Sequence, residues 1–102
     1  MNKYIKSART AIARAIARKV HKWAVETNAC SMVFSSLEMY VMLREIPYQT
    51  YKRKEIHFLR GYTFIFIDEM DKLCGGATTR STIGRNLYCW DLTKSKKIKE
   101  RW

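Results

Sequence analysis

The sequence predicts an α+β fold, in which a long N-terminal basic amphipathic helix precedes a small mixed body with a few antiparallel strands and a short helix. Apolar residues recur at helical spacing in the first quarter of the chain, and aromatic and β-branched residues alternate along later segments. The 102 residues, 47% of them apolar, fit a single domain with its own core. We divide it into a basic helix at 1–28, a compact α+β body at 29–93 and a cationic tail at 94–102.

The N-terminal helix is expected over residues 3–27, where apolar side chains recur every three or four positions. At 1.5 Å per residue it would be about 37 Å long, which is long for so small a domain. Alanines raise the helix propensity of this stretch, and Asn28 is a suitable stop. We expect Trp23 to anchor the helix on the body. The apolar stripe consists of Ile5, Ala8, Ile12, Ile16, Val20 and Trp23.

A short second helix is expected to begin after Ser35. Ser35 and Glu38 have the spacing of a capping box, in which each side chain accepts a hydrogen bond from the backbone N–H of the other residue. Pro47 would end this helix at residue 45 or 46, because proline disfavours the helical conformation of the residue before it. A strand over residues 39–43 is the alternative.

Strands are expected in the rest of the body. Residues 48–67 are rich in aromatic and β-branched side chains, and within them residues 62–67 are apolar on both faces, which is typical of a central strand. A turn at residues 60–61 would precede that strand. A loop is expected at residues 75–81, where two glycines begin a polar stretch, and a final strand at residues 86–92.

The net charge of +11 lies entirely at the two ends of the chain. Residues 1–25 carry seven Lys or Arg and no acid, residues 26–93 carry eight basic and eight acidic side chains, and residues 94–102 carry five basic side chains and one acid. A neutral body with two cationic ends indicates a polyanionic or acidic partner, because concentrated charge of one sign repels itself until something binds it.

The candidate binding residues are cations on these two ends, together with one aromatic residue. In the helix, Arg14, Arg18 and Lys22 step by four and form one ridge. An ordinary solvated face is the alternative interpretation, although surface helices usually mix both signs of charge. Trp102 and Tyr4 could stack on unpaired bases. The full candidate set is Arg14, Arg18, Lys22, Lys96, Lys97, Lys99, Arg101 and Trp102.

We therefore expect a small non-enzymatic accessory protein that binds DNA or RNA phosphates through the helix and the tail, without reading base sequence. The alternative is an interaction or inhibitor protein that docks on a larger nucleic-acid-processing protein, in the general style of compact phage and plasmid accessory proteins. A small ribonuclease, using Lys, Arg, Tyr and His around residues 51–60 and 80–88, is a lesser alternative. Anionic lipid is a third partner that the amphipathic helix permits.

The sequence predicts no cofactor, no metal site and no transmembrane segment. The three cysteines, Cys30, Cys74 and Cys89, are odd in number and lack CxxC spacing, so we expect reduced thiols and a cytoplasmic location. Zinc held by these cysteines and a histidine is the weaker alternative. No apolar run approaches the roughly 20 residues of a membrane span. The Arg-rich N-terminus also has features of a mitochondrial presequence, but its low serine content argues against one.

One segment resembles a motif of a known family. Residues 63–73 read Thr-Phe-Ile-Phe-Ile-Asp-Glu-Met-Asp-Lys-Leu and are similar to the Walker B strand of AAA+ ATPases, which delivers an Asp-Glu pair to magnesium and water. The chain lacks a GxxxxGK[ST] phosphate-binding loop and is too short for the rest of that domain, so we do not expect ATP hydrolysis. Asp68, Glu69 and Asp71 are then interpreted as the polar exit of a strand.

Overall fold

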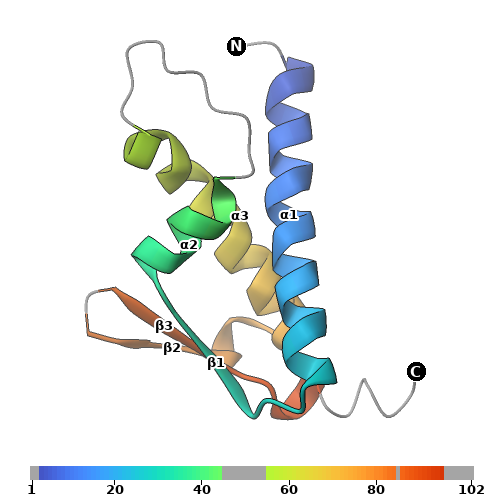
Figure 1. Ribbon diagram of the computed structural model, residues 1–102. Coiled ribbons are helices and arrows are strands. Elements are labelled where there is room, and N and C mark those ends of the chain that lie inside the picture. The colour runs from blue at the N-terminus through green and yellow to red at the C-terminus, as the bar shows by residue number, and fades with distance from the viewer. Residues whose placement is uncertain (1–2, 45–54, 85, 96–102) are drawn as a thin grey trace.

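The computed structural model describes residues 3–44, 55–84 and 86–95 and confirms the α+β class. Helices pack against one another at one end of a three-stranded antiparallel sheet (Figure 1). The helices are α1 (Lys3–Glu26), α2 (Ser36–Leu43) and α3 (Glu55–Cys74), and the strands are β1 (Ser31–Ser35), β2 (Arg80–Ile83) and β3 (Leu87–Asp91), with a 3₁₀ turn η1 (Ala77–Thr79) before β2.

The predicted N-terminal helix is confirmed as α1, and its stop is the predicted Asn28. Asn28 has a φ of 60°, in the left-handed region that asparagine tolerates. The N–H groups of Asn28 and Ala29 donate to the carbonyl oxygens of Val25 and Ala24. This pair of bonds is a Schellman motif, which satisfies carbonyl groups that the helix end would leave unpaired.

The buried face of α1 differs from the apolar stripe that the sequence predicts. Ala13, Ala17 and Ala24 have no exposed surface, and α1 packs chiefly against α3. Because alanine side chains are short, the two helices approach closely along this face. Of the predicted stripe, Ile16 is also buried and its neighbours Ile12 and Val20 are partly buried against the core, whereas Trp23 is 63% exposed. The prediction that Trp23 anchors the helix on the body is therefore wrong.

The predicted capping box opens α2. The N–H of Glu38 donates to Ser35 Oγ at 3.1 Å, and the N–H of Ser35 donates to Glu38 Oε1 at 3.0 Å. The helix, and not the alternative strand over residues 39–43, forms here because the box satisfies two N–H groups of the first turn. It ends at Leu43, and Pro47, which was expected to end it, lies outside the described residues.

The predicted central strand at residues 62–67 is wrong, because these residues belong to α3, as does the expected turn at 60–61. The strand-like alternation covers only six residues, whereas burial follows helical spacing as far as Cys74. Strand propensity spans only about 1 kcal/mol per residue, so packing of a long helix overrides it. One consequence is that Phe64 faces solvent at 68% exposure. The buried positions are Tyr62, Thr63, Phe66, Ile67, Glu69, Met70, Asp71 and Cys74.

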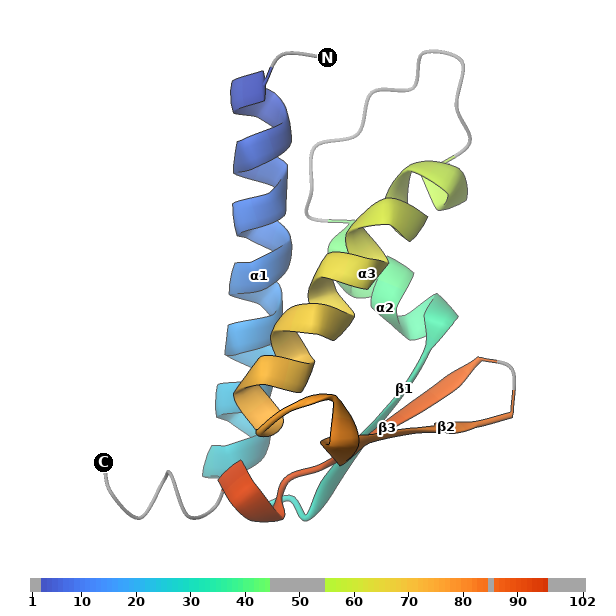
Figure 2. The same cartoon turned by 180° about the vertical axis from the view of Figure 1, so that it is seen from behind.

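The sheet has the order β1-β3-β2, so the predicted final strand is its centre (Figure 2). The predicted loop at residues 75–81 is shorter than expected, because β2 already begins at Arg80. Trp90 of β3 pairs with Met32 on one side and Arg80 on the other, and it has no exposed surface. Its ring lies 6.4 Å from the ring of Phe66 at 80°, an edge-to-face contact that places α3 over the sheet.

Asp71 connects the end of α3 to two strands. Trp90 Nε1 donates to Asp71 Oδ1 at 2.7 Å, and Arg80 Nε lies 3.1 Å from the same oxygen. The backbone carbonyl of Asp71 accepts from the N–H of Gly76 at 2.7 Å, in a second Schellman motif closed by Gly75 at φ 112°. Only glycine adopts that φ without strain, so the two glycines end α3 where its last turn meets the sheet.

We expect Asp71→Ala to lower the free energy of unfolding by about 2–4 kcal/mol, because it leaves the buried Trp90 N–H without its acceptor and the Arg80 guanidinium without its ion-pair partner. The matched control is Asp68→Ala on the same helix. Asp68 is 63% exposed and, among the residues that the structure describes, pairs with Lys72 alone, so its loss should cost no more than about 0.5 kcal/mol. Urea unfolding followed by tryptophan fluorescence measures both values. Equal losses for the two variants would contradict the role given to Asp71.

Candidate nucleic-acid and partner interface

Three candidate cations form a ridge along the outer side of α1, as the sequence predicts. Arg14, Arg18 and Lys22 follow one another at one-turn spacing, and their side chains are 47%, 62% and 67% exposed. We call these three residues the basic ridge. Because successive side chains are four residues apart, their charges lie about 6 Å apart along the helix axis and present one cationic strip to solvent.

The basic ridge is partly paired by carboxylates. Arg18 Nε donates to Glu69 Oε1 at 2.9 Å, and Arg14 Nε lies 4.0 Å from Glu69 Oε2. Lys22 Nζ lies 4.0 Å from Glu26 Oε1. Glu69 reaches the ridge from α3 and its side chain is only 11% exposed, so it fixes two arginines at the α1–α3 boundary. Sequence reasoning missed this pairing because Glu69 is 51 positions from Arg18.

The start of the cationic tail is fixed against the same helix. Ser95 has no exposed surface, and its Oγ forms a 2.9 Å hydrogen bond with Nε2 of His21, which is 7% exposed. Ser95 Oγ also lies 3.5 Å from the carbonyl oxygen of Leu73 on α3. Ser95, which is far from α1 in sequence, therefore lies against the helix that carries the basic ridge. The tail candidates Lys96, Lys97, Lys99, Arg101 and Trp102 lie outside the described residues.

A hollow of about 400 Å³ lies beside the basic ridge. It is lined by Arg18, His21, Lys22 and Leu73. Two of these four side chains are exposed cations, so the hollow has the charge that a phosphate group requires. Burial lowers the pKa of His21 below its usual 6.5, and the imidazole is therefore neutral at pH 7.

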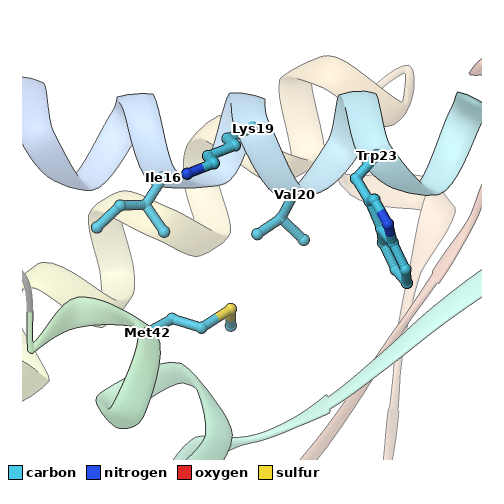
Figure 3. A pocket seen from close by; sticks show the side chains of 5 residues that line it. All are labelled: Ile16, Lys19, Val20, Trp23 and Met42. Carbon is cyan, nitrogen blue, oxygen red and sulfur yellow. The ribbon is translucent and has the colours of Figure 1, made fainter.

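A second feature of α1, which the sequence did not reveal, is an apolar groove on the flank that faces α2. One hollow of about 300 Å³ is lined by Ile16, Lys19, Val20, Trp23 and Met42, and Figure 3 shows Met42 of α2 facing the α1 side chains across it. A second hollow, of about 350 Å³, shares Met42 and continues over Phe34, Leu37, Glu38 and Val41. We call the two hollows together the α1–α2 groove.

The segment that resembles a Walker B strand is helical, so the strand that the resemblance implies is absent from residues 63–73. Each of its acids has a structural partner in the described part of the chain. Asp68 Oδ2 lies 3.1 Å from Lys72 Nζ, Glu69 holds the basic ridge, and Asp71 binds Trp90. The interpretation of these acids as the polar exit of a strand is therefore wrong. Glu69 and Asp71 attach α3 to α1 and to the sheet, and Asp68 pairs within α3 itself.

The cysteines lie in different environments. Cys30 is exposed, Cys89 is half-buried and Cys74 is buried. Burial, together with the nearby charge of Asp71, raises the pKa of Cys74 to about 11, so this thiol is protonated and unreactive at neutral pH. Within residues 3–44, 55–84 and 86–95, no three His, Cys, Asp or Glu side chains come together as a metal site, and no helix has the length and apolar character to cross a bilayer.

The residues considered for a ribonuclease do not come together as a described site. Arg80 forms an ion pair with Asp71, and the Tyr88 ring stacks on the ring of Trp90 with 6.3 Å between their centroids. Residues 51–54 lie outside the described part of the chain, and the side chains of residues 55–60 do as well.

Comparison of the chain with protein families, with curated proteins and with solved structures found no match in any of the three.

We expect stability to fall as the pH drops below 6.5, because the unfolded chain protonates His21 at its ordinary pKa and the folded chain only at a lower one. The contribution of the neutral His21 to the free energy of unfolding is fully present above pH 6.5. It is lost progressively as the pH falls toward the lower pKa of the folded state, by at most about 1.4 kcal/mol per pH unit. Urea unfolding of the wild type and His21→Gln at pH 7.5, 6.5 and 5.5 measures the difference. Parallel pH profiles for the two proteins would show that His21 is not desolvated.

Proposed function

We propose that this protein binds nucleic acid, without catalysis and without a cofactor, through one basic surface built from the basic ridge and the tail. The observation that carries the proposal is the hydrogen bond between His21 and Ser95. This bond holds Ser95 beside three exposed cations of α1, and four further cations follow Ser95 in the sequence, so we propose that charges from both ends of the chain act on the same ligand.

The paired arginines are suited to phosphate. A guanidinium has five N–H donors, and the bond from Arg18 to Glu69 uses one of them. The buried carboxylate holds the arginine in place, which reduces the side-chain entropy that binding would otherwise remove. Contacts of this kind go to the sugar-phosphate backbone and not to base edges, so we propose binding without strong sequence preference.

A second candidate function is docking on a larger protein that handles nucleic acid. The observation that favours it is the 63% exposure of Trp23 on the α1–α2 groove. Tryptophan is among the residues that most often dominate the binding energy of protein interfaces. The two functions use opposite flanks of α1, so one protein can perform both.

The first test removes the ridge charge from the full-length protein by Arg14→Gln, Arg18→Gln and Lys22→Gln, with Glu69→Gln added so that no buried carboxylate loses its partners. Affinity for a labelled oligonucleotide of about 20 nucleotides, measured by fluorescence anisotropy, should fall at least about tenfold. The slope of log affinity against log salt should decrease by about 2–3, since each lost phosphate contact removes about 0.7–0.9.

Two single variants are the controls for this test. Glu69→Gln alone should change the affinity far less than the ridge variant does, because losing a negative charge strengthens phosphate binding while releasing Arg18 weakens it. Arg44→Gln, on α2 and away from the basic ridge, should change the affinity by less than about twofold, since one distant charge is screened. Binding by the wild type that does not vary between about 50 and 200 mM salt would exclude phosphate as the ligand.

The second test compares two truncations. A chain that ends at Ser95 loses the cations of residues 96–102 and should bind the oligonucleotide at least about tenfold more weakly, with stability unchanged. A chain that ends at Thr93 also loses the buried Ser95 and its bond to His21, so we expect a further loss of about 1–2 kcal/mol in unfolding free energy. Equal stability of the two truncated chains would show that Ser95 does not fix the tail.

A further inference from the structure

The α1–α2 groove exposes large apolar side chains that a folded chain normally covers. Trp23 is 63% exposed, Leu37 is 67% exposed and Val41 is 55% exposed. Trp23 lines the first hollow, and Leu37 and Val41 line the second. Single exposed apolar residues are common, but contiguous apolar patches on a protein surface mark interaction sites. The groove therefore has the character of a binding surface.

The charge of the groove defines the chemistry of its occupant. Lys19 is the one charged residue among those that line the hollow beside Trp23, and Glu38 of the second hollow accepts a hydrogen bond from the Ser35 N–H in the capping box. Unlike Arg14, Arg18 and Lys22, Lys19 has no ion-pair partner among the residues that the structure describes. A cation at the edge of an apolar hollow is complemented by a carboxylate on the ligand.

We infer that the α1–α2 groove binds an amphipathic helix of a partner protein, with its apolar side against Trp23, Val20 and Met42 and an acidic side chain at Lys19. This inference rests on the second candidate function, docking on a larger protein, and specifies its site and the chemistry of the partner.

A helix fits the groove because both of its long walls are helices. The backbone N–H and C=O groups of α1 and α2 are bonded within their own helices, so they offer an extended peptide no backbone hydrogen bonds. An occupant must satisfy its own backbone groups, which a helix does. The apolar residues of the α1 wall, Ile16, Val20 and Trp23, are spaced by four and three, and they match the spacing of the apolar face of a second helix.

A second copy of this chain is a poorer occupant. The chain carries a net charge of +11, so two copies repel each other, whereas an acidic segment is attracted to the same surface. The oligomeric state is therefore one of the measured outcomes, and the proposed occupant is another protein.

The test uses the full-length protein and synthetic peptides of about 16 residues, the length of a helix of four to five turns. One peptide has leucines at every third or fourth position, flanked by glutamates. A second peptide has the same apolar face with lysines in place of the glutamates, and a third has the composition of the first in an order without an apolar face. Fluorescence anisotropy of the labelled peptides should show at least tenfold tighter binding of the first than of the other two.

The variants locate the binding on the groove. Trp23→Ala should weaken binding of the acidic amphipathic peptide at least tenfold, whereas Phe64→Ala, an equally exposed aromatic residue on α3 outside both hollows, should change it less than twofold. Lys19→Glu should weaken binding of the glutamate peptide and strengthen binding of the lysine peptide. Only a charge that faces the peptide directly produces such a reversal.

The same variants separate this inference from nucleic-acid binding. The ridge variant should lose oligonucleotide affinity and keep peptide affinity, and Trp23→Ala should do the opposite. Three results would overturn the inference. Trp23→Ala and Phe64→Ala could weaken peptide binding equally, or the acidic peptide without an apolar face could bind as tightly as the amphipathic acidic peptide. The third is that no peptide binds at a concentration of about 1 mM. A dimer in analytical ultracentrifugation that Trp23→Ala dissociates would overturn it as well, because the occupant would then be a second copy.

Discussion

The buried carboxylate of Asp71 is the interaction on which the rest of this fold depends. It accepts a hydrogen bond from the Trp90 indole N–H of the central strand and forms an ion pair with the guanidinium of Arg80 on an edge strand. A desolvated carboxylate is stable only with such partners, so the end of α3 has one favourable position relative to the sheet. That position sets where the other side of α3 meets α1, and it also places Leu73 beside Ser95 at the start of the tail. The placement of the basic ridge and of Ser95 thus depends on one acid in the neutral body.

The alanine face of α1 has a comparable consequence for function. Because Ala13, Ala17 and Ala24 occupy the centre of the buried face of α1, the exposed cations and Trp23 lie on the two flanks of that face. The charged flank lies toward Glu69 and forms the basic ridge, and the apolar flank lies toward Met42 and forms the α1–α2 groove. A helix with large apolar residues in the contact would have buried Val20 and Trp23, and the groove would not exist.

Local signals in the sequence were sufficient for the elements whose determinants are local. The capping box at Ser35, the stop at Asn28 and the final strand around Trp90 are each encoded within a few residues, and the structure has all three. The sequence predicts a strand where α3 lies because residues 62–67 have a strand-like composition. The helical spacing of the buried residues becomes clear only over the longer segment that ends at Cys74. The ridge residues can be predicted from their spacing. The groove, the pairing of Arg18 with Glu69 and the hydrogen bond between His21 and Ser95 cannot, since each depends on contacts between distant segments.

The strand order β1-β3-β2 also has a consequence for how the chain acquires its structure. The central strand is the last of the three to leave the ribosome, so neither β1 nor β2 can find its partner until almost all of the described chain has been synthesised. Until then, both have unpaired backbone groups and the site for Trp90 is empty. The helices, whose backbone hydrogen bonds are local, can form earlier. Folding of the sheet is therefore a late, nearly simultaneous event, in which the arrival of β3 pairs both edges and brings the Trp90 indole to the end of α3.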